Sequence, residues 1–257
     1  MRRKIRFLTM VLTLATVAAG VDPPDGEGVM NKVSGVLARL RDLQADVTVQ
    51  TSKKQAAGSI VLEYVRKDGD AQQSESRMRR YKVVTRTRVR GQTVRVTQIN
   101  DGDYLWAEVK SLESGKVSVT RRKIKAGAPV PGGLGLDFRR RFGDMRKRFA
   151  FQTVGTGTYR DEPVVLIQGT RKKEADAGVQ PDEGGGVPRR VDAYVSSRDD
   201  FPRRVVLVMG RTASKALPER QTQKIVVELL NVKLNKGLKP DTFAYRIPPG
   251  AAFREIK

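Results

Sequence analysis

Two pairs of carboxylates are the side chains of this sequence whose types and spacing suit acid–base chemistry: Asp101 with Asp103, and Asp199 with Asp200. Two carboxylates suffice for glycoside hydrolysis, which leaves a carboxylate-only glycosidase open as an enzyme class. Both pairs lie in turn-like contexts, where aspartates usually serve the turn itself. The turn interpretation is therefore favoured.

The rest of the composition excludes most classes of enzyme mechanism. The 257 residues include no histidine and no cysteine, which removes the commonest general base and metal ligand, thiol nucleophiles and disulfides. No GxSxG nucleophile motif occurs. The sequence therefore predicts a protein that is not an enzyme and uses no cofactor or metal.

The charge is strongly positive. Lys and Arg number 50 against 28 Asp and Glu, a formal net charge of +22, which predicts anionic partners such as acidic lipid, nucleic acid or another acidic polymer. Nucleic acid is disfavoured because aromatic residues make up only 6% of the chain and are not interleaved with Lys and Arg.

The first twenty residues, MRRKIRFLTMVLTLATVAAG, place four cations before an apolar run that ends in small residues. This pattern is typical of a secretory signal peptide, and the run is short for a permanent anchor across ~30 Å of hydrocarbon. We expect a cleavable signal at 1–20 and a single exported domain at 21–257. Its length suffices for a core without disulfides.

Helical periodicity precedes a long series of strands. One predicted helical face is apolar, through Val29, Val33, Val36, Leu37, Leu40 and Leu43. From Ala45 the period changes to two, and short turns between the runs favour an antiparallel meander. In VVTRTRVR, Thr85 and Thr87 share one face while Arg86 and Arg88 share the other. The fold class is α+β, with one large antiparallel sheet of about ten strands, which usually curls at that size.

A second amphipathic helix is predicted behind a Pro- and Gly-rich loop at 126–135. Its apolar face is Phe138, Phe142, Met145 and Phe149, and its flanks are loaded with arginine and lysine. Two interpretations remain: a helix that caps an apolar space, which we favour, or one that lies on an anionic membrane surface. Residues 172–190 are polar and Gly-rich, and predict a flexible surface loop.

Several ordered motifs resemble the periplasmic lipoprotein carrier family, LolA, and its outer-membrane lipoprotein-sorting relatives. They are LQADVTVQ and GSIVLEYVRK after the first helix, INDGDYLWAEV, FPRRVVLVMG, and the C-terminal LLNVKLNKGLKPDTFAYRIPPGAAF. The most specific are Asp101-Gly102 with Leu105-Trp106, and the C-terminal Asn231, Asn235, Phe243 and Pro248-Pro249-Gly250. The order runs nearly the length of the predicted domain.

The resemblance implies a half-open β-barrel whose concave face is apolar and covered by helices, in which acyl chains are held without covalent chemistry. It implies a monomeric carrier in the periplasm that takes lipoprotein acyl chains or phospholipid, with docking proteins at the inner and outer membranes. Asp101-Gly102 would be a hairpin turn that fixes strand register. The remaining alternative is a periplasmic adaptor that binds anionic lipid or an envelope polymer through its basic surface.

Candidate residues for the cavity and its helical lids are apolar side chains from both helices and from the strands, because acyl chains are held by non-directional contacts. They are Val33, Leu37, Leu40, Leu62, Tyr64, Leu105, Trp106, Phe138, Phe142, Met145 and Phe149. The family's arginine that holds barrel and lid together has its nearest match here in Arg66.

Overall fold

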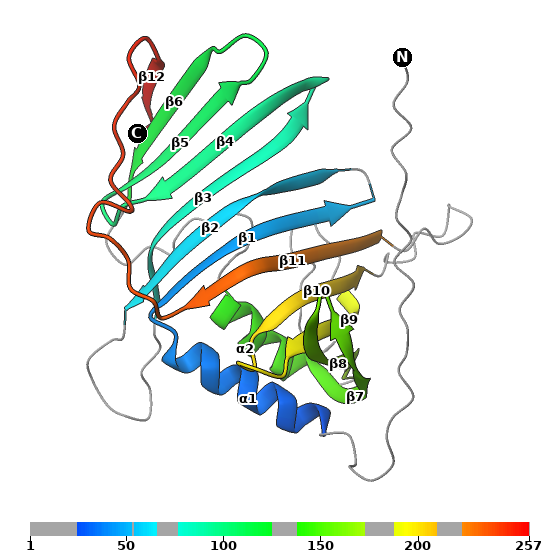
Figure 1. Ribbon diagram of the computed structural model, residues 1–257. Helices are drawn as coiled ribbons and strands as arrows, with labels where there is room; N and C mark the ends of the chain where they lie inside the picture. Colours follow the sequence, from blue (N-terminus) through cyan, green and yellow to red (C-terminus); the bar gives the residue numbers. More distant parts are fainter. Residues whose placement is uncertain are drawn as a thin grey trace.

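The structure is a computed structural model that describes residues 25–52, 54–65, 77–124, 138–172, 188–209 and 223–256. Within these ranges it contains twelve strands and two helices (Figure 1). The first half consists of α1 (Gly26–Arg39), β1 (Asp42–Thr51), β2 (Gln55–Val65), β3 (Arg77–Val89), β4 (Gln92–Asn100), β5 (Tyr104–Ser111) and β6 (Val117–Lys123). The second half consists of α2 (Phe138–Arg148), β7 (Phe149–Tyr159), β8 (Glu162–Arg171), β9 (Pro188–Ser196), β10 (Pro202–Met209), β11 (Gln223–Leu234) and β12 (Ala252–Ile256).

All twelve strands form one sheet in the order β12-β6-β5-β4-β3-β2-β1-β11-β10-β9-β8-β7. Two antiparallel meanders, β1 to β6 and β7 to β11, are joined where β1 pairs with β11. The edges β12 and β7 do not pair, so the curved sheet stays open, as the predicted half-open barrel requires. One pairing departs from the antiparallel prediction: β12 runs parallel to β6, because the chain crosses from β11 to that edge through residues 235–251.

Both helices lie against the concave face of the sheet (Figure 1). Helix α1 begins at the cap Asp25, whose Oδ1 accepts the Glu27 backbone N–H at 3.3 Å. Its start is tied to β7, because the Phe151 backbone N–H donates to the Glu27 carboxylate at 3.0 Å. A Cβ on Gly26 would lie 2.5 Å from the backbone of Gln152, so only glycine permits this approach.

The predicted apolar stripe continues further than helix α1 itself. Leu40 is the C-cap with ψ of 121°, and Leu43 belongs to β1. The chain leaves the helix here because Asn235 Oδ1 accepts the Arg41 backbone N–H at 2.6 Å and β1 then pairs on both sides. Both leucines are buried all the same. The leucines from Leu37 to Leu43 have the spacing of one helical face, but the chain forms the end of a helix and then the start of a strand.

Helix α2 confirms the predicted amphipathic helix, except that Phe149 begins β7. Phe138 and Phe142 are buried against the sheet and α1, which agrees with the interpretation of α2 as a cap. Arg139 and Arg146 contact α1, and Arg141 and Lys147 are exposed.

A second, smaller apolar cluster covers the outer face of β4 to β6. Its buried members are Ile99, Trp106, Val119 and Phe243. The C-terminal segment supplies Phe243, and its start is fixed where Asn235 accepts the Arg41 backbone N–H and where the Asp42 carboxylate accepts the N–H groups of residues 236 and 237, each at 3.1 Å. Asn231, still within β11, donates to Asp46 of β1 at 2.7 Å. The C-terminal pattern therefore serves to fasten this segment to the sheet.

Candidate functional site

Most of the predicted cavity and lid residues come together on the concave face. The buried ones share one cluster with the inner faces of β1 to β3 and β7 to β11, and the partly buried ones pack against it. The buried candidates are Val33, Leu37, Leu40, Leu62, Tyr64, Phe138, Phe142 and Phe149; the partly buried ones are Leu105 and Met145. The space directly under the helices is thus filled by side chains of the chain itself.

Trp106 is not part of this group. Its neighbour Leu105 faces the concave side, and successive strand residues point to opposite faces, so Trp106 faces outward. Its ring lies 5.0 Å from that of Tyr245 in the C-terminal segment. Its indole N–H donates to the Asp101 carboxylate at 2.7 Å.

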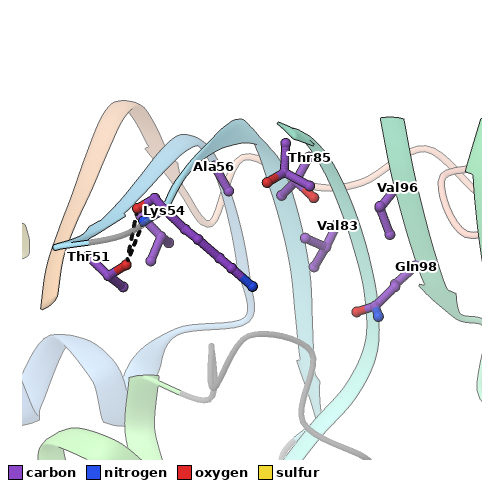
Figure 2. Close-up of a pocket in the computed structure, with 9 residues that line it drawn as sticks. Thr51, Lys54, Ala56, Val83, Thr85, Val96 and Gln98 are labelled. Carbon is purple, nitrogen blue, oxygen red and sulfur yellow. Dashed lines mark hydrogen bonds between the residues drawn. The ribbon is translucent and has the colours of Figure 1, made fainter. Parts of the chain in front are cut away.

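An open pocket lies on the concave face near the turn between β1 and β2 (Figure 2). Its volume is about 340 Å³, which is within the range of ~300 to 1,000 Å³ typical of small-molecule sites. The lining residues come from β1 to β4 and the β1–β2 turn: Val49, Thr51, Lys54, Ala56, Val83, Thr85, Thr87, Val96 and Gln98. Val83 also belongs to the main core cluster, and Val49 packs against it, so the pocket borders the helix-covered region.

Sequence reasoning missed this pocket. The available signal was the Thr85 and Thr87 face of β3, because a strand face with small polar side chains in a concave sheet leaves space that larger residues would fill. Gly58 of β2 has a different role: a Cβ there would lie 1.7 Å from the Val84 carbonyl oxygen, so only glycine permits the close approach of the β3 backbone.

The pocket carries one positive charge at its mouth. The Thr51 backbone N–H donates to the Lys54 carbonyl at 2.8 Å, and the Lys54 N–H donates to the Thr51 hydroxyl at 3.0 Å. This fixed turn holds the Lys54 side chain, which reaches into the pocket (Figure 2). Within the described ranges no carboxylate forms an ion pair with it. An apolar wall with a cation at its entrance suits a molecule with an apolar chain and an anionic head.

The two helices are fastened to each other by arginines of α2. Arg139 donates to the carbonyl oxygens of Leu40 and of Ala38, the latter at 3.0 Å, and its guanidinium lies 4.8 Å from the centre of the Tyr64 ring. Arg146 donates to Ser34 and Asn31, at 3.2 Å and 2.6 Å. Arg139 therefore links both helices and β2, the contact that the resemblance assigns to an arginine; Arg66 lies outside the described residues.

The carboxylate pairs serve turns and ion pairs. Asp101 orders the β4–β5 turn, and Asp199 accepts from Arg203 at 2.7 Å. In the described part of the chain, no three His, Cys, Asp or Glu residues are grouped as metal ligands require.

Two further predictions fall wholly or partly outside the described residues. The predicted signal segment 1–20 is not among them, and of the predicted loop 172–190 only the two ends are, with Pro188 already in β9. No described helix has the length and apolar content needed to cross a bilayer.

No protein-family model matches the chain, and no curated protein matches its sequence. Among solved structures, the chain is similar to LprF from Mycobacterium bovis, with 12% identity and a TM-score of 0.49, covering 86% of this chain and 97% of that one. It is similar to the lipoprotein LppX from Mycobacterium tuberculosis, with 14% identity and a TM-score of 0.45, covering 82% and 95% of the two chains.

A LolA superfamily protein from Nitrosomonas europaea matches with 12% identity and a TM-score of 0.24, covering 86% of this chain and 98% of that one. LolA-like proteins, which the sequence motifs resemble, are thus among the solved structures to which this chain is similar.

Proposed function

We propose that this protein is an exported carrier that binds the acyl chains of lipoproteins or lipids non-covalently on the concave face of its sheet and shuttles them across the cell envelope. The observation that carries the proposal is the pocket of about 340 Å³ that borders the helix-covered core. Its walls are mainly Val and Ala side chains and the methyl groups of threonines, and Lys54 lies at its mouth.

The energetics of such a site need no precise polar contacts. Each methylene moved from water into an apolar site contributes about 0.8 kcal/mol, so about ten buried methylenes would contribute about 8 kcal/mol, the free energy of a micromolar Kd. Lys54 would hold the carboxylate or phosphate of the head group at the entrance. Gln98 and the threonines of the pocket would donate hydrogen bonds to the ester oxygens that join the head group to the acyl chains.

A whole lipid needs more room than the pocket, and the adjacent space is occupied by the helices. We infer that α1 and α2 move outward as a cover, so that acyl chains take the places of Phe142 and Leu37 against the sheet. In the described ranges, few polar interactions tie the two helices to the sheet. The Phe151 backbone N–H of β7 donates to Glu27, Lys172 Nζ donates to the Arg146 carbonyl, and the Arg139 guanidinium lies over the Tyr64 ring of β2. The apolar surface that the moving helices expose would be covered again by the lipid, so the net cost of opening is small.

The cellular setting of this proposal comes from the sequence. The cationic and apolar pattern of residues 1–20 supports export to the periplasm. There a monomeric carrier would receive lipoprotein acyl chains or phospholipid from one membrane and deliver them to the other, with docking proteins at each. No catalytic step is part of the proposal.

Two alanines in β2 provide a matched test. Ala56 lines the pocket, whereas Ala57 is exposed on the other face of the same strand. A tryptophan at position 56 would fill the pocket and displace several methylenes. We expect Ala56→Trp to weaken binding of a fluorescent long-chain fatty acid by about tenfold or more.

Ala57→Trp should bind the same probe as tightly as the wild type. Thermal unfolding followed by circular dichroism checks that both variants fold. Equal probe affinity in Ala56→Trp and Ala57→Trp, both folded, would show that acyl chains do not enter the pocket.

A further inference from the structure

Three hairpin turns lie together at one end of the sheet. Because the strands alternate in direction, the β1–β2, β3–β4 and β5–β6 turns are all at the same end, the upper end of these strands in Figure 1. We call this end the hairpin rim and define it by residues 86–95 and 109–118 together with Lys54. The pocket opens beside it, since Thr51, Lys54 and Thr87 line the pocket.

The rim carries an excess of positive charge. Residues 86–95 and 109–118 include six cations and one carboxylate, Glu113, which accepts the Thr93 backbone N–H at 2.7 Å. In the described turns at the opposite end of the sheet, five aspartates, at 101, 103, 161, 199 and 200, outnumber two cations, Arg160 and Arg198. The molecule therefore has a charge asymmetry along its strands.

Three of the rim cations are arranged in a way that costs stability. Arg86 of β3 lies directly opposite Arg95 of β4, which in turn lies opposite Lys110 of β5. Like charges in directly opposed positions of adjacent strands repel. Arg95 is compensated by Glu108 at 3.1 Å, whereas Arg86 and Lys110 have no ion pair within the described ranges. Such a row is explained most simply by an anionic partner.

Apolar side chains are exposed at the tips of the same hairpins. Val89 is 49% exposed at the end of β3, and Leu112 is 44% exposed in the β5–β6 turn. Cations next to both, such as Arg88 and Lys116, are exposed. Apolar tips surrounded by cations are the pattern of an element that lies in the interface of a bilayer.

From this arrangement we propose that the hairpin rim docks on an anionic lipid bilayer. Val89 and Leu112 insert among the acyl chains, and Arg86, Arg88, Arg90, Arg95, Lys110 and Lys116 contact the lipid phosphates. Nucleic acid fits less well, because residues 86–95 and 109–118 contain no aromatic side chain on which a base could stack. Docking in this orientation brings the pocket mouth to the membrane surface, but it does not depend on the pocket binding lipid.

Insertion is tested with single cysteines, because the chain has none of its own. Val89→Cys and Leu112→Cys carry an environment-sensitive fluorophore, and Ser197→Cys, in the β9–β10 turn at the opposite end, is the control. With vesicles of phosphatidylcholine containing about one third phosphatidylglycerol, we expect a blue shift at 89 and 112 and none at 197. A shift at 197 equal to those at the rim would overturn the proposal.

Charge reversal provides an independent readout. Arg88→Glu with Lys116→Glu should weaken binding to the anionic vesicles by at least about thirtyfold, since each removed cation accounts for about fivefold and the added carboxylates are repelled by the lipid phosphates. Arg198→Glu with Lys239→Glu makes the same change in net charge away from the rim and should bind nearly as the wild type does. Equal loss in both double variants would mean that only net charge matters, and the rim would not be the docking site.

The nature of the partner is decided by combining the two readouts. If the rim charge reversal abolishes vesicle binding but positions 89 and 112 show no blue shift on bound protein, the rim recognises anionic groups at the surface without inserting, and the proposed docking by insertion is wrong. Loss of acyl-probe binding in Ala56→Trp together with unchanged vesicle docking would support the carrier and the rim as separate sites.

Discussion

The Asp101 carboxylate accepts the indole N–H of Trp106 at 2.7 Å and, through its other oxygen, the backbone N–H groups of Asp103 and Tyr104, at 2.9 Å and 2.7 Å. One side chain thus shapes the β4–β5 turn and fixes the single tryptophan of the chain on the outer face. The Asp-Gly turn therefore positions the Trp106 ring against which Tyr245 of the C-terminal segment packs.

Asp101→Ala should destabilise the fold, because three donors lose their acceptor and the indole N–H is nearly buried. We expect a loss of about 2 kcal/mol in the free energy of unfolding. Urea unfolding followed by circular dichroism measures it. Asp103→Ala is the control, since no hydrogen bond to its carboxylate is found in the described ranges, and a comparable loss in that variant would contradict the assigned role of Asp101.

Arg139→Gln should loosen the helical cover. The variant loses the bonds to the Ala38 and Leu40 carbonyls and the contact with the Tyr64 ring. Removing these interactions should lower the hydrogen-exchange protection of residues 26–39 by about tenfold. The matched variant is Arg141→Gln, whose side chain is exposed on the same helix. If protection in α1 falls equally in both variants, Arg139 does not fasten the cover.

The Glu63–Arg80 pair predicts an acid dependence of stability. Arg80 donates two hydrogen bonds to the Glu63 carboxylate, at 2.6 Å and 2.7 Å, and these bonds hold the pKa of Glu63 below its ordinary value. A carboxyl whose pKa is lowered by folding stabilises the folded state above its ordinary pKa, and this contribution is lost as the pH falls through the lowered one.

Glu63→Gln should therefore unfold more easily than the wild type at neutral pH, by about 1 kcal/mol. The difference should shrink as the pH falls below the ordinary glutamate pKa of ~4.3. Denaturant unfolding at a series of pH values measures this. A difference between the two proteins that stays constant down to strongly acidic pH would show that the pair does not titrate as described.

Lys54 should give the pocket a preference for anionic head groups. The wild type should bind a long-chain fatty acid more tightly than the alcohol of equal length, by at most about fivefold, because the ammonium group is exposed and its pairing is screened. Lys54→Ala should bind both equally well. Competition against a fluorescent probe measures the two affinities, and a preference that survives in Lys54→Ala would assign head-group recognition to another residue.

Local pattern is enough to predict one large antiparallel sheet and its two helices, whereas the half-open form of the sheet is predicted only from the family resemblance. Period-two runs separated by turn residues predict most strands, and the Asp-Gly turn is predicted with its correct role. The predicted end of α1 is wrong because Leu40 and Leu43 satisfy the helical spacing, whereas the turn out of the helix depends on Asn235, far away in sequence.

The candidate site is harder to predict for a related reason. The resemblance places both Leu105 and Trp106 in the cavity, although neighbours on one strand face opposite ways; deciding which one faces inward requires the covering segment that carries Phe243. The contacts of Arg139 and the outline of the pocket depend on how α2 and β1 to β4 come together. Packing between segments distant in sequence leaves no periodic signal within either one.

Lipid carried by the native protein tests the central claim most directly. The full chain and its Ala56→Trp variant are purified from the expressing cell without detergent, and the molecules released on denaturation are identified by mass spectrometry. We predict that the wild type releases an acylated lipid or lipopeptide in near-stoichiometric amount and that the variant releases much less. A wild-type protein that folds fully and releases no acylated molecule, or a variant that releases as much as the wild type, would contradict the carrier account.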